Sequence, residues 1–225
     1  MTARASLVEI VAALAERYPI PTLPSDPFQL ILWDNIGYLV DDERRRRLFD
    51  AFEREVGLDP AAILAADPDL LLRLAKGGGM RPETRVDRWR TIAHIVLETA
   101  DFAATLRALP LAKAQALVKR FPTIAEPGAD KILLLSGIAA TPALDSNGLR
   151  VLARLGIFEE GADYGHSYKA AITVLARDGD TTGPWLATAF HVLREHGKAL
   201  CKRGDPSCLA CPLDAICAHV DVGAL

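Results

Sequence analysis

Apolar residues recur along most of the chain at intervals of three or four, which is the spacing of an amphipathic helix. In residues 5–18, for example, the apolar positions include Leu7, Ile10, Val11 and Leu14. The same period predicts helices over residues 27–32, 41–56, 59–66, 68–76, 83–99, 102–109, 111–120, 128–135, 146–155, 167–177 and 184–200. No alternating run of β-branched residues is long enough to compete as a strand. The pattern therefore predicts an all-α protein.

Length and composition are those of a globular protein. The 225 residues can form one large domain or two smaller ones with a sizeable core. A content of 50% hydrophobic and 24% charged residues excludes a disordered or fibrous chain. No apolar run is long enough to cross a membrane. The first residues lack the layout of a secretory signal, so we expect a cytoplasmic protein, associated with the nucleoid if the source is a prokaryote.

Charge is distributed unevenly along the chain. The net charge of −3 and a pI near 6.0 argue against a uniformly basic nucleic-acid binder. Residues 71–120 nevertheless contain ten lysines or arginines and four acidic residues, a local net charge of +6. Such a stretch is either a solvated helical surface or a local phosphate-binding face. The acidic net charge of the whole chain therefore does not exclude a nucleic-acid partner.

The four cysteines, Cys201, Cys208, Cys211 and Cys217, all lie within one short segment. Their spacing, C-x6-C-x2-C-x5-C, keeps them in one loop, whereas a disulfide framework would spread them to close long loops. Four thiolates can surround one zinc ion or a [4Fe–4S] cluster. The spacing therefore predicts a metal site in a reducing compartment, with unligated cysteines as the alternative.

The segment from His196 to Cys217 resembles the cluster loop of the endonuclease III-like, helix-hairpin-helix (HhH-GPD) DNA glycosylases. In that family this cysteine spacing holds a [4Fe–4S] cluster. The resemblance implies the same cofactor here, with zinc as the alternative, and a role in base excision repair of DNA. We expect His191 and His196 to pack against the cluster and not to ligate it.

Residues 121–133 resemble the hairpin of the same family without gaps. The family pattern is apolar-Pro-Gly-apolar-Gly, but Thr123 and Ala125 replace the two glycines here. A glycine lets backbone N–H groups at a helix N-terminus approach a DNA phosphate, so the replacements narrow that approach. The resemblance implies DNA contacts by Thr123, Ile124 and Ala125, and the Thr123 hydroxyl could itself donate to a phosphate. Taken alone, the segment is a helix–turn–helix corner.

Residues 143–156 resemble the active-site segment of the family, in which an aspartate precedes a helix and His or Asn follows two residues later. Asp145 and Asn147 hold these positions. Cleavage of a base from its sugar builds positive charge on the deoxyribose, which a nearby carboxylate stabilises. The resemblance implies a catalytic role for Asp145 and a DNA contact by Asn147. Asp145 also suits a helix cap, and the two roles are compatible.

Two loops correspond to those that fill the space left by a flipped nucleotide in the family. Tyr38 and Leu39 lie in the first loop, and Met80 lies in the second. Endonuclease III itself carries glutamine where this chain has Leu39. Apolar side chains can act as wedges between base pairs, so we expect all three residues to contact DNA.

Pro127 stands where bifunctional members carry a lysine that attacks C1′ as a Schiff-base nucleophile. Because proline has no nucleophile, the resemblance implies a monofunctional glycosylase or a loss of activity. Lys131 lies about one helical turn further on. It is either a displaced nucleophile, which would make the protein a bifunctional glycosylase and abasic-site lyase, or a contact to a DNA phosphate.

Together these segments imply a two-lobed helical fold. A six-helix lobe with the helix-hairpin-helix covers residues 24–138, and an iron–sulfur cluster lobe combines residues 1–23 and 139–225. The implied partner is double-stranded DNA with a lesion or mismatch, which would lie in the cleft between the lobes. We expect the protein to be a monomer and not to bind a membrane. The implied reaction is hydrolytic removal of the base; the alternative is a non-catalytic protein that binds DNA structures. The acidic net charge predicts weaker, more salt-sensitive DNA binding than that of a basic glycosylase.

Overall fold

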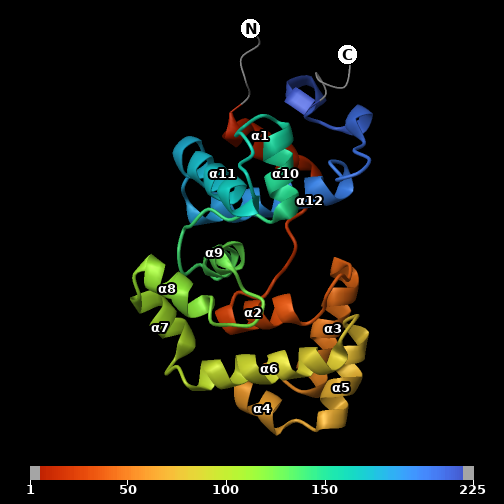
Figure 1. Cartoon of the computed structure of the whole chain (residues 1–225), viewed down its shortest axis with the longest axis vertical. Helices are drawn as coiled ribbons and strands as arrows, with labels where there is room; N and C mark the ends of the chain where they lie inside the picture. The colour runs from red at the N-terminus through yellow and green to blue at the C-terminus, as the bar shows by residue number, and fades with distance from the viewer. Residues whose placement is uncertain (1–5, 220–225) are drawn as a thin grey trace. The chain divides into compact units, whose positions relative to one another are not determined.

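Helices joined by short loops make up the part of the chain that the computed structural model describes, residues 6–219, and this part contains no strand (Figure 1). It divides into two units. Unit 1 runs to Thr22 and resumes at Ala139, and unit 2 spans Leu23–Ile138. The all-α prediction is confirmed. Among the described residues, no helix is both long and apolar enough to span a membrane.

Unit 1 is organised around its last long helix. The helices of this unit are α1 (Leu7–Arg17), α10 (Ser146–Arg154), α11 (Tyr164–Asp178) and α12 (Gly183–Ala199). Helix α12 packs against both α10 and α1, and Figure 1 shows these helices side by side. Leu14, Leu152 and Leu193 are fully buried in the shared core. Beyond α12 the chain makes two 3-10 turns, Cys208–Ala210 and Asp214–Ile216, which carry the cysteine loop.

Unit 2 contains eight helices, against the six implied by the resemblance. They are α2 (Pro27–Asn35), α3 (Asp42–Glu55), α4 (Pro60–Ala65), α5 (Pro68–Gly77), α6 (Pro82–Leu97), α7 (Phe102–Ala108), α8 (Leu111–Val118) and α9 (Glu126–Leu135). Helices α2, α4 and α5 all pack against α6. Trp89 of α6 is buried edge-on against Phe52, with 4.9 Å between ring centroids, and its indole N–H donates to the Asn35 carbonyl at 3.1 Å. Burial of the Trp89 ring against Phe52 of α3 therefore helps to place α6 at the centre of this unit.

Local signals in the sequence explain where the helices begin. In eight of the described helices the side chain at the N-cap accepts a hydrogen bond from the first turn, which replaces a missing backbone partner. These caps are Ser6, Asp26, Asp41, Asp59, Asp67, Asp101, Asp145 and Asp163. Proline stands in the first turn of α2, α4, α5, α6, α9 and α12, where its missing N–H has no helical partner to lose.

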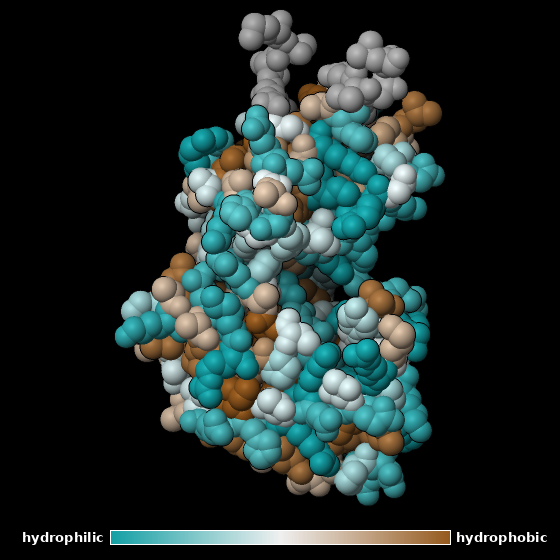
Figure 2. Space-filling view, viewed as in Figure 1, coloured by the Kyte–Doolittle hydropathy of each residue, from teal (hydrophilic) through white to brown (hydrophobic). Residues whose placement is uncertain are grey.

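Many of the arginines serve the structure of unit 2. Arg44 donates to the Gly77 carbonyl at 2.8 Å, and Arg46 stacks over the Trp33 ring at 4.5 Å. In the basic stretch 71–120, Arg85 is buried, while Arg73 and Arg120 pair with acidic side chains. The local charge of +6 therefore overstates the charge available to a phosphate. On the face drawn in Figure 2, hydrophobic residues form small separate patches among hydrophilic ones.

Candidate functional site

Asp145 is the N-cap of α10, and its carboxylate is held by short hydrogen bonds. Oδ1 accepts the backbone N–H groups of Asn147 and Gly148, both at 2.9 Å. Oδ2 accepts the Asn147 side-chain amide at 2.9 Å, and Nε of Arg194 on α12 lies 3.5 Å from Oδ2. The helix N-terminus adds partial positive charge at the same place. The helix-cap interpretation is confirmed, and 28% of the Asp145 side chain stays exposed.

Asn147 lies between the carboxylate and an arginine of the same helix. Its side-chain oxygen accepts a hydrogen bond from Nη2 of Arg150 at 3.0 Å. Helix α12 approaches closely here because residue 197 is glycine: a Cβ atom there would lie 2.7 Å from the Asn147 carbonyl oxygen and 2.8 Å from its Cβ. The orientation of Asn147 therefore depends on both helices.

The same helix, α10, anchors the start of the cysteine loop. Arg150 donates to the carbonyls of Gly197 and Cys201, at 2.8 and 2.9 Å. One turn further, Arg154 donates to the carbonyls of Lys202 and Arg203, at 2.7 and 3.0 Å. Helix α10 thus carries Asp145 at its start and two arginines that fix the first cysteine and the residues after it.

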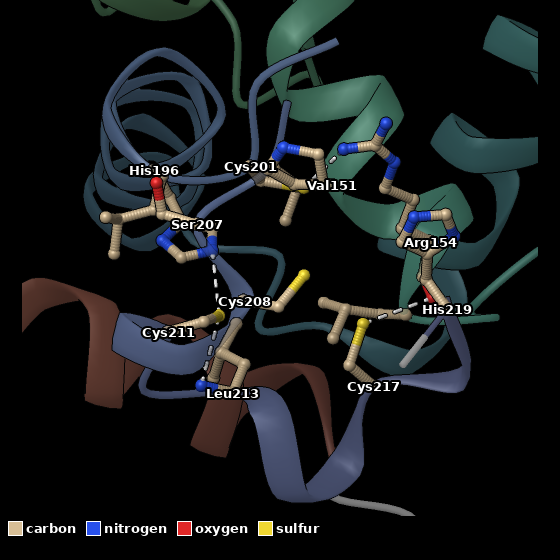
Figure 3. A pocket seen from close by; sticks show the side chains of 13 residues that line it. Val151, Arg154, His196, Cys201, Ser207, Cys208, Cys211, Leu213, Cys217 and His219 are labelled. Atoms are coloured by element: carbon tan, nitrogen blue, oxygen red, sulfur yellow. Dashed lines mark hydrogen bonds between the residues drawn. The ribbon is translucent and has the colours of Figure 1, made fainter. Parts of the chain in front are cut away.

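All four cysteines line one cavity beside α10. Figure 3 shows their side chains around this space, with His196 at its edge. Its apolar walls include Val151, Leu155, Leu200 and Leu213. In the described chain, no three His, Cys, Asp or Glu residues are grouped closely enough to hold a single metal ion.

Several polar groups point at the sulfurs. Nη1 of Arg154 lies 3.4 Å from Sγ of Cys201, and the Leu213 N–H donates to Sγ of Cys211 at 3.4 Å. Burial raises the pKa of the Cys211 thiol, and the neighbouring cysteines add to this rise. A bound cation would offset that cost, because metal ligation deprotonates a thiol. The donor set and the N–H groups aimed at sulfur fit a [4Fe–4S] cluster held by Cys201, Cys208, Cys211 and Cys217.

His196 packs beside this cavity, with 1% of its surface exposed. Its Nε2 lies 3.5 Å from Sγ of Cys211, and its Nδ1 lies 3.1 Å from the Tyr18 hydroxyl. Burial lowers the pKa of His196 to about 4, and the positive charge of Arg17 adds to the effect. The imidazole is therefore neutral near pH 7.

The hairpin lies between α8 and α9 in unit 2. Thr123 has φ +65°, in the left-handed region where glycine is favoured, which explains why the family has glycine there. Its hydroxyl donates to Oδ1 of the buried Asn35 at 3.1 Å, so a phosphate contact from Thr123 would use its backbone and not its hydroxyl. Ile124 is buried and offers only its backbone, whereas Ala125 is exposed at the N-cap of α9.

Lys131 forms an ion pair inside unit 2. Its Nζ donates to both carboxylate oxygens of Asp34 on α2, at 2.6 and 2.5 Å. The two side chains are only 23% and 19% exposed. Pro127, in the first turn of α9, has no reactive atom to offer in its place.

The predicted wedge residues are exposed and lie on neighbouring loops. Tyr38, Leu39 and Met80 are 55%, 79% and 64% exposed. The Tyr38 N–H donates to the Gly78 carbonyl at 2.9 Å, which joins the two loops. Tyr38, Met80 and Thr123 line one open pocket, together with Asp34 and Arg88. The structure thus brings together three residues predicted to contact DNA that are far apart in sequence.

Solved structures of DNA glycosylases superpose on most of this chain. A trapped covalent endonuclease III–DNA intermediate and a non-covalent endonuclease III–DNA complex each give a TM-score of 0.73 at 15% identity, over 96% of this chain and 95% of theirs. This chain has the endonuclease III fold. A thermostable thymine-DNA glycosylase gives a TM-score of 0.72 at 15% identity, over 95% of this chain and 96% of its own. No protein-family model and no curated protein sequence matches the chain.

Within the endonuclease III fold, sequence reasoning missed several polar residues beside the predicted ones. Asp34 pairs with Lys131, Arg150 and Arg194 contact the Asp145–Asn147 pair, and Tyr18 contacts His196. Tyr164 is a further neighbour: burial raises the pKa of its hydroxyl, and the negative charge of Asp145 adds to the rise. Arg150 lies on the same helix as Asn147, whereas the partners of the other residues lie on different helices, so no local motif marks them.

Proposed function

We propose that this protein is a DNA repair glycosylase that removes a damaged or mispaired base from double-stranded DNA by hydrolysis. The observation that carries the proposal is the ordered Asp145 carboxylate at the start of α10, on a fold shared with endonuclease III–DNA complexes and a thymine-DNA glycosylase. A flipped-out nucleotide places its sugar next to protein groups, where a carboxylate can act on it.

The hydrogen bonds of Asp145 suit the charge that develops during base removal. Each carboxylate oxygen has two lone-pair sites. Both sites of Oδ1 are taken by backbone N–H groups, whereas Oδ2 accepts the Asn147 side-chain amide and lies 3.5 Å from Nε of Arg194. With 28% of its side chain exposed, the Asp145 carboxylate is accessible to a water molecule or to the electron-poor sugar. Because the carboxylate is already fixed, little reorganisation is needed as positive charge forms on the deoxyribose.

The reaction proposed is hydrolysis without strand cleavage. A Schiff-base nucleophile must offer a neutral amine. Pro127 has no amine, and the Lys131 ammonium donates two hydrogen bonds to the Asp34 carboxylate. We therefore favour a monofunctional glycosylase over a combined glycosylase and abasic-site lyase.

The cofactor proposed is a [4Fe–4S] cluster on the four cysteines, which supports the loop that follows α12. When bound, the cluster would cross-link this loop and provide a centre able to exchange an electron. Iron and acid-labile sulfide in the purified brown protein would support this assignment. A colourless protein that contains zinc would overturn it.

A panel of duplexes, each with one lesion or mismatch, tests the proposed reaction. Free base is measured by mass spectrometry for the wild-type protein and for Asp145→Asn, whose side chain preserves the helix cap. We expect release of at least one base by the wild type and a strong loss in the variant. Binding to the duplexes with no base release by either protein would favour the non-catalytic alternative.

A further inference from the structure

Tyr18, His196 and Cys211 form a chain of contacts that ends on a sulfur of the cysteine cavity. The Tyr18 hydroxyl lies 3.1 Å from Nδ1 of His196, and Nε2 on the other side of the ring lies 3.5 Å from Sγ of Cys211. The two rings meet edge-on, with 5.8 Å between centroids. Tyr18 follows α1, and His196 lies in the last turn of α12, so packing of these helices aligns the chain.

Ligation of a metal by Cys211 fixes the direction of a hydrogen bond between Cys211 and His196. A ligating sulfur is a thiolate and cannot donate a hydrogen bond. A hydrogen bond between the two groups must then be donated by Nε2, which has to carry a ring proton. The Tyr18 hydroxyl lies 3.1 Å from Nδ1 and can donate to it, which favours the tautomer that carries its proton on Nε2.

We propose that His196 donates a hydrogen bond from Nε2 to the Cys211 thiolate in the cluster-loaded protein, and that Tyr18 is the positioning residue that fixes the required tautomer. This proposal rests on the [4Fe–4S] assignment above and does not depend on the glycosylase reaction. The proposal gives Cys211, one of the four cluster ligands, a side-chain hydrogen-bond donor.

The expected consequence is a higher reduction potential. A hydrogen bond to a ligand sulfur stabilises the more negatively charged, reduced state of a cluster. The effect is strong at this place, because His196 is almost fully buried and water does not compete for Nε2. The Leu213 N–H donates to the same sulfur and would remain in a His196 variant.

The test compares midpoint potentials of cluster-loaded full-length proteins without DNA, after iron and sulfide have been counted in each. The variants are His196→Phe, which removes the donor, His196→Gln, whose amide nitrogen can replace Nε2, and Tyr18→Phe, which removes one oxygen atom. Tyr168→Phe, a buried tyrosine on α11, is the matched control.

We expect the potential to fall in His196→Phe, to fall less in Tyr18→Phe, to return toward the wild-type value in His196→Gln and to stay unchanged in Tyr168→Phe. An unchanged potential in fully loaded His196→Phe would overturn the proposal. Should that variant fail to retain the cluster, an unchanged potential in loaded Tyr18→Phe would overturn it instead. Zinc in the wild-type protein would refute the cofactor assignment. That result is distinguishable from an iron–sulfur cluster whose midpoint potential is the same in the wild type and in the His196 and Tyr18 variants.

Discussion

Lys131 donates two hydrogen bonds to the carboxylate of Asp34, and this pair joins α9 to α2 within unit 2. The sequence left Lys131 as either a displaced nucleophile or a contact to a DNA phosphate, and the structure places it in an ion pair. In this arrangement Lys131 holds together the helix that follows the hairpin and the helix that carries Asn35.

The first prediction concerns covalent trapping at an abasic site. We expect no borohydride-trapped adduct between the wild-type protein and an abasic-site duplex, because Lys131 is paired and residue 127 is proline. Pro127→Lys, which supplies an amine at the position of the family nucleophile, should form an adduct. An adduct of the wild type that disappears in Lys131→Ala would show that Lys131 is the nucleophile after all.

The second prediction is that the same pair contributes to stability. Lys131→Ala should lower the free energy of unfolding by about 2 kcal/mol, because Asp34 is left without its partner in a partly buried place. The loss stays below that of a fully buried pair, since about a fifth of each side chain is exposed. Arg177→Ala removes an exposed ion pair with Asp178 and should change stability by less than about 0.5 kcal/mol. If chemical denaturation showed the same loss of unfolding free energy in Lys131→Ala and Arg177→Ala, this account would be contradicted.

The third prediction concerns the close approach of α12 to Asn147. Gly197→Ala should destabilise unit 1 by roughly 1–3 kcal/mol, because the new Cβ would lie 2.7–2.9 Å from atoms of Asn147. It should also slow base release, because Asn147 holds Oδ2 of Asp145. Gly204→Ala, where a Cβ meets no atom within 4 Å, is the control. Thermal unfolding curves that shift equally in both variants would argue against a tight contact.

The fourth prediction concerns the hairpin. Thr123→Val should lower the free energy of unfolding by about 1–2 kcal/mol, because the buried side-chain oxygen of Asn35 loses its hydrogen bond. Thr123→Ser retains the hydroxyl and should lie near the wild type in the same urea titration. Similar values for Val and Ser would mean that the contact contributes nothing.

The sequence was sufficient wherever the signal is local. The spacing of apolar residues and the Asp and Pro residues at helix starts located the helices, and the Asp145 cap depends only on the residues that follow it. The four cysteines are close in sequence, and they line one cavity.

Contacts between distant segments could not be foreseen in the same way. Lys131 and Asp34 are 97 residues apart, and Tyr18 and His196 are 178 apart. Each pair depends on how helices pack, which no spacing within one segment reveals. Thr123 combines both cases: the missing glycine was visible in the sequence, but the Asn35 side chain that binds the Thr123 hydroxyl was not.

Base release by Asp145→Asn tests the central claim most directly. On a duplex whose base the wild type removes, single-turnover rates of free-base release are measured together with strand cleavage before and after alkali. Because asparagine keeps the helix cap but lacks the negative charge, we expect a rate lower by roughly 100-fold or more, with the wild-type strand cut only after alkali. Equal rates for the two proteins would contradict the account.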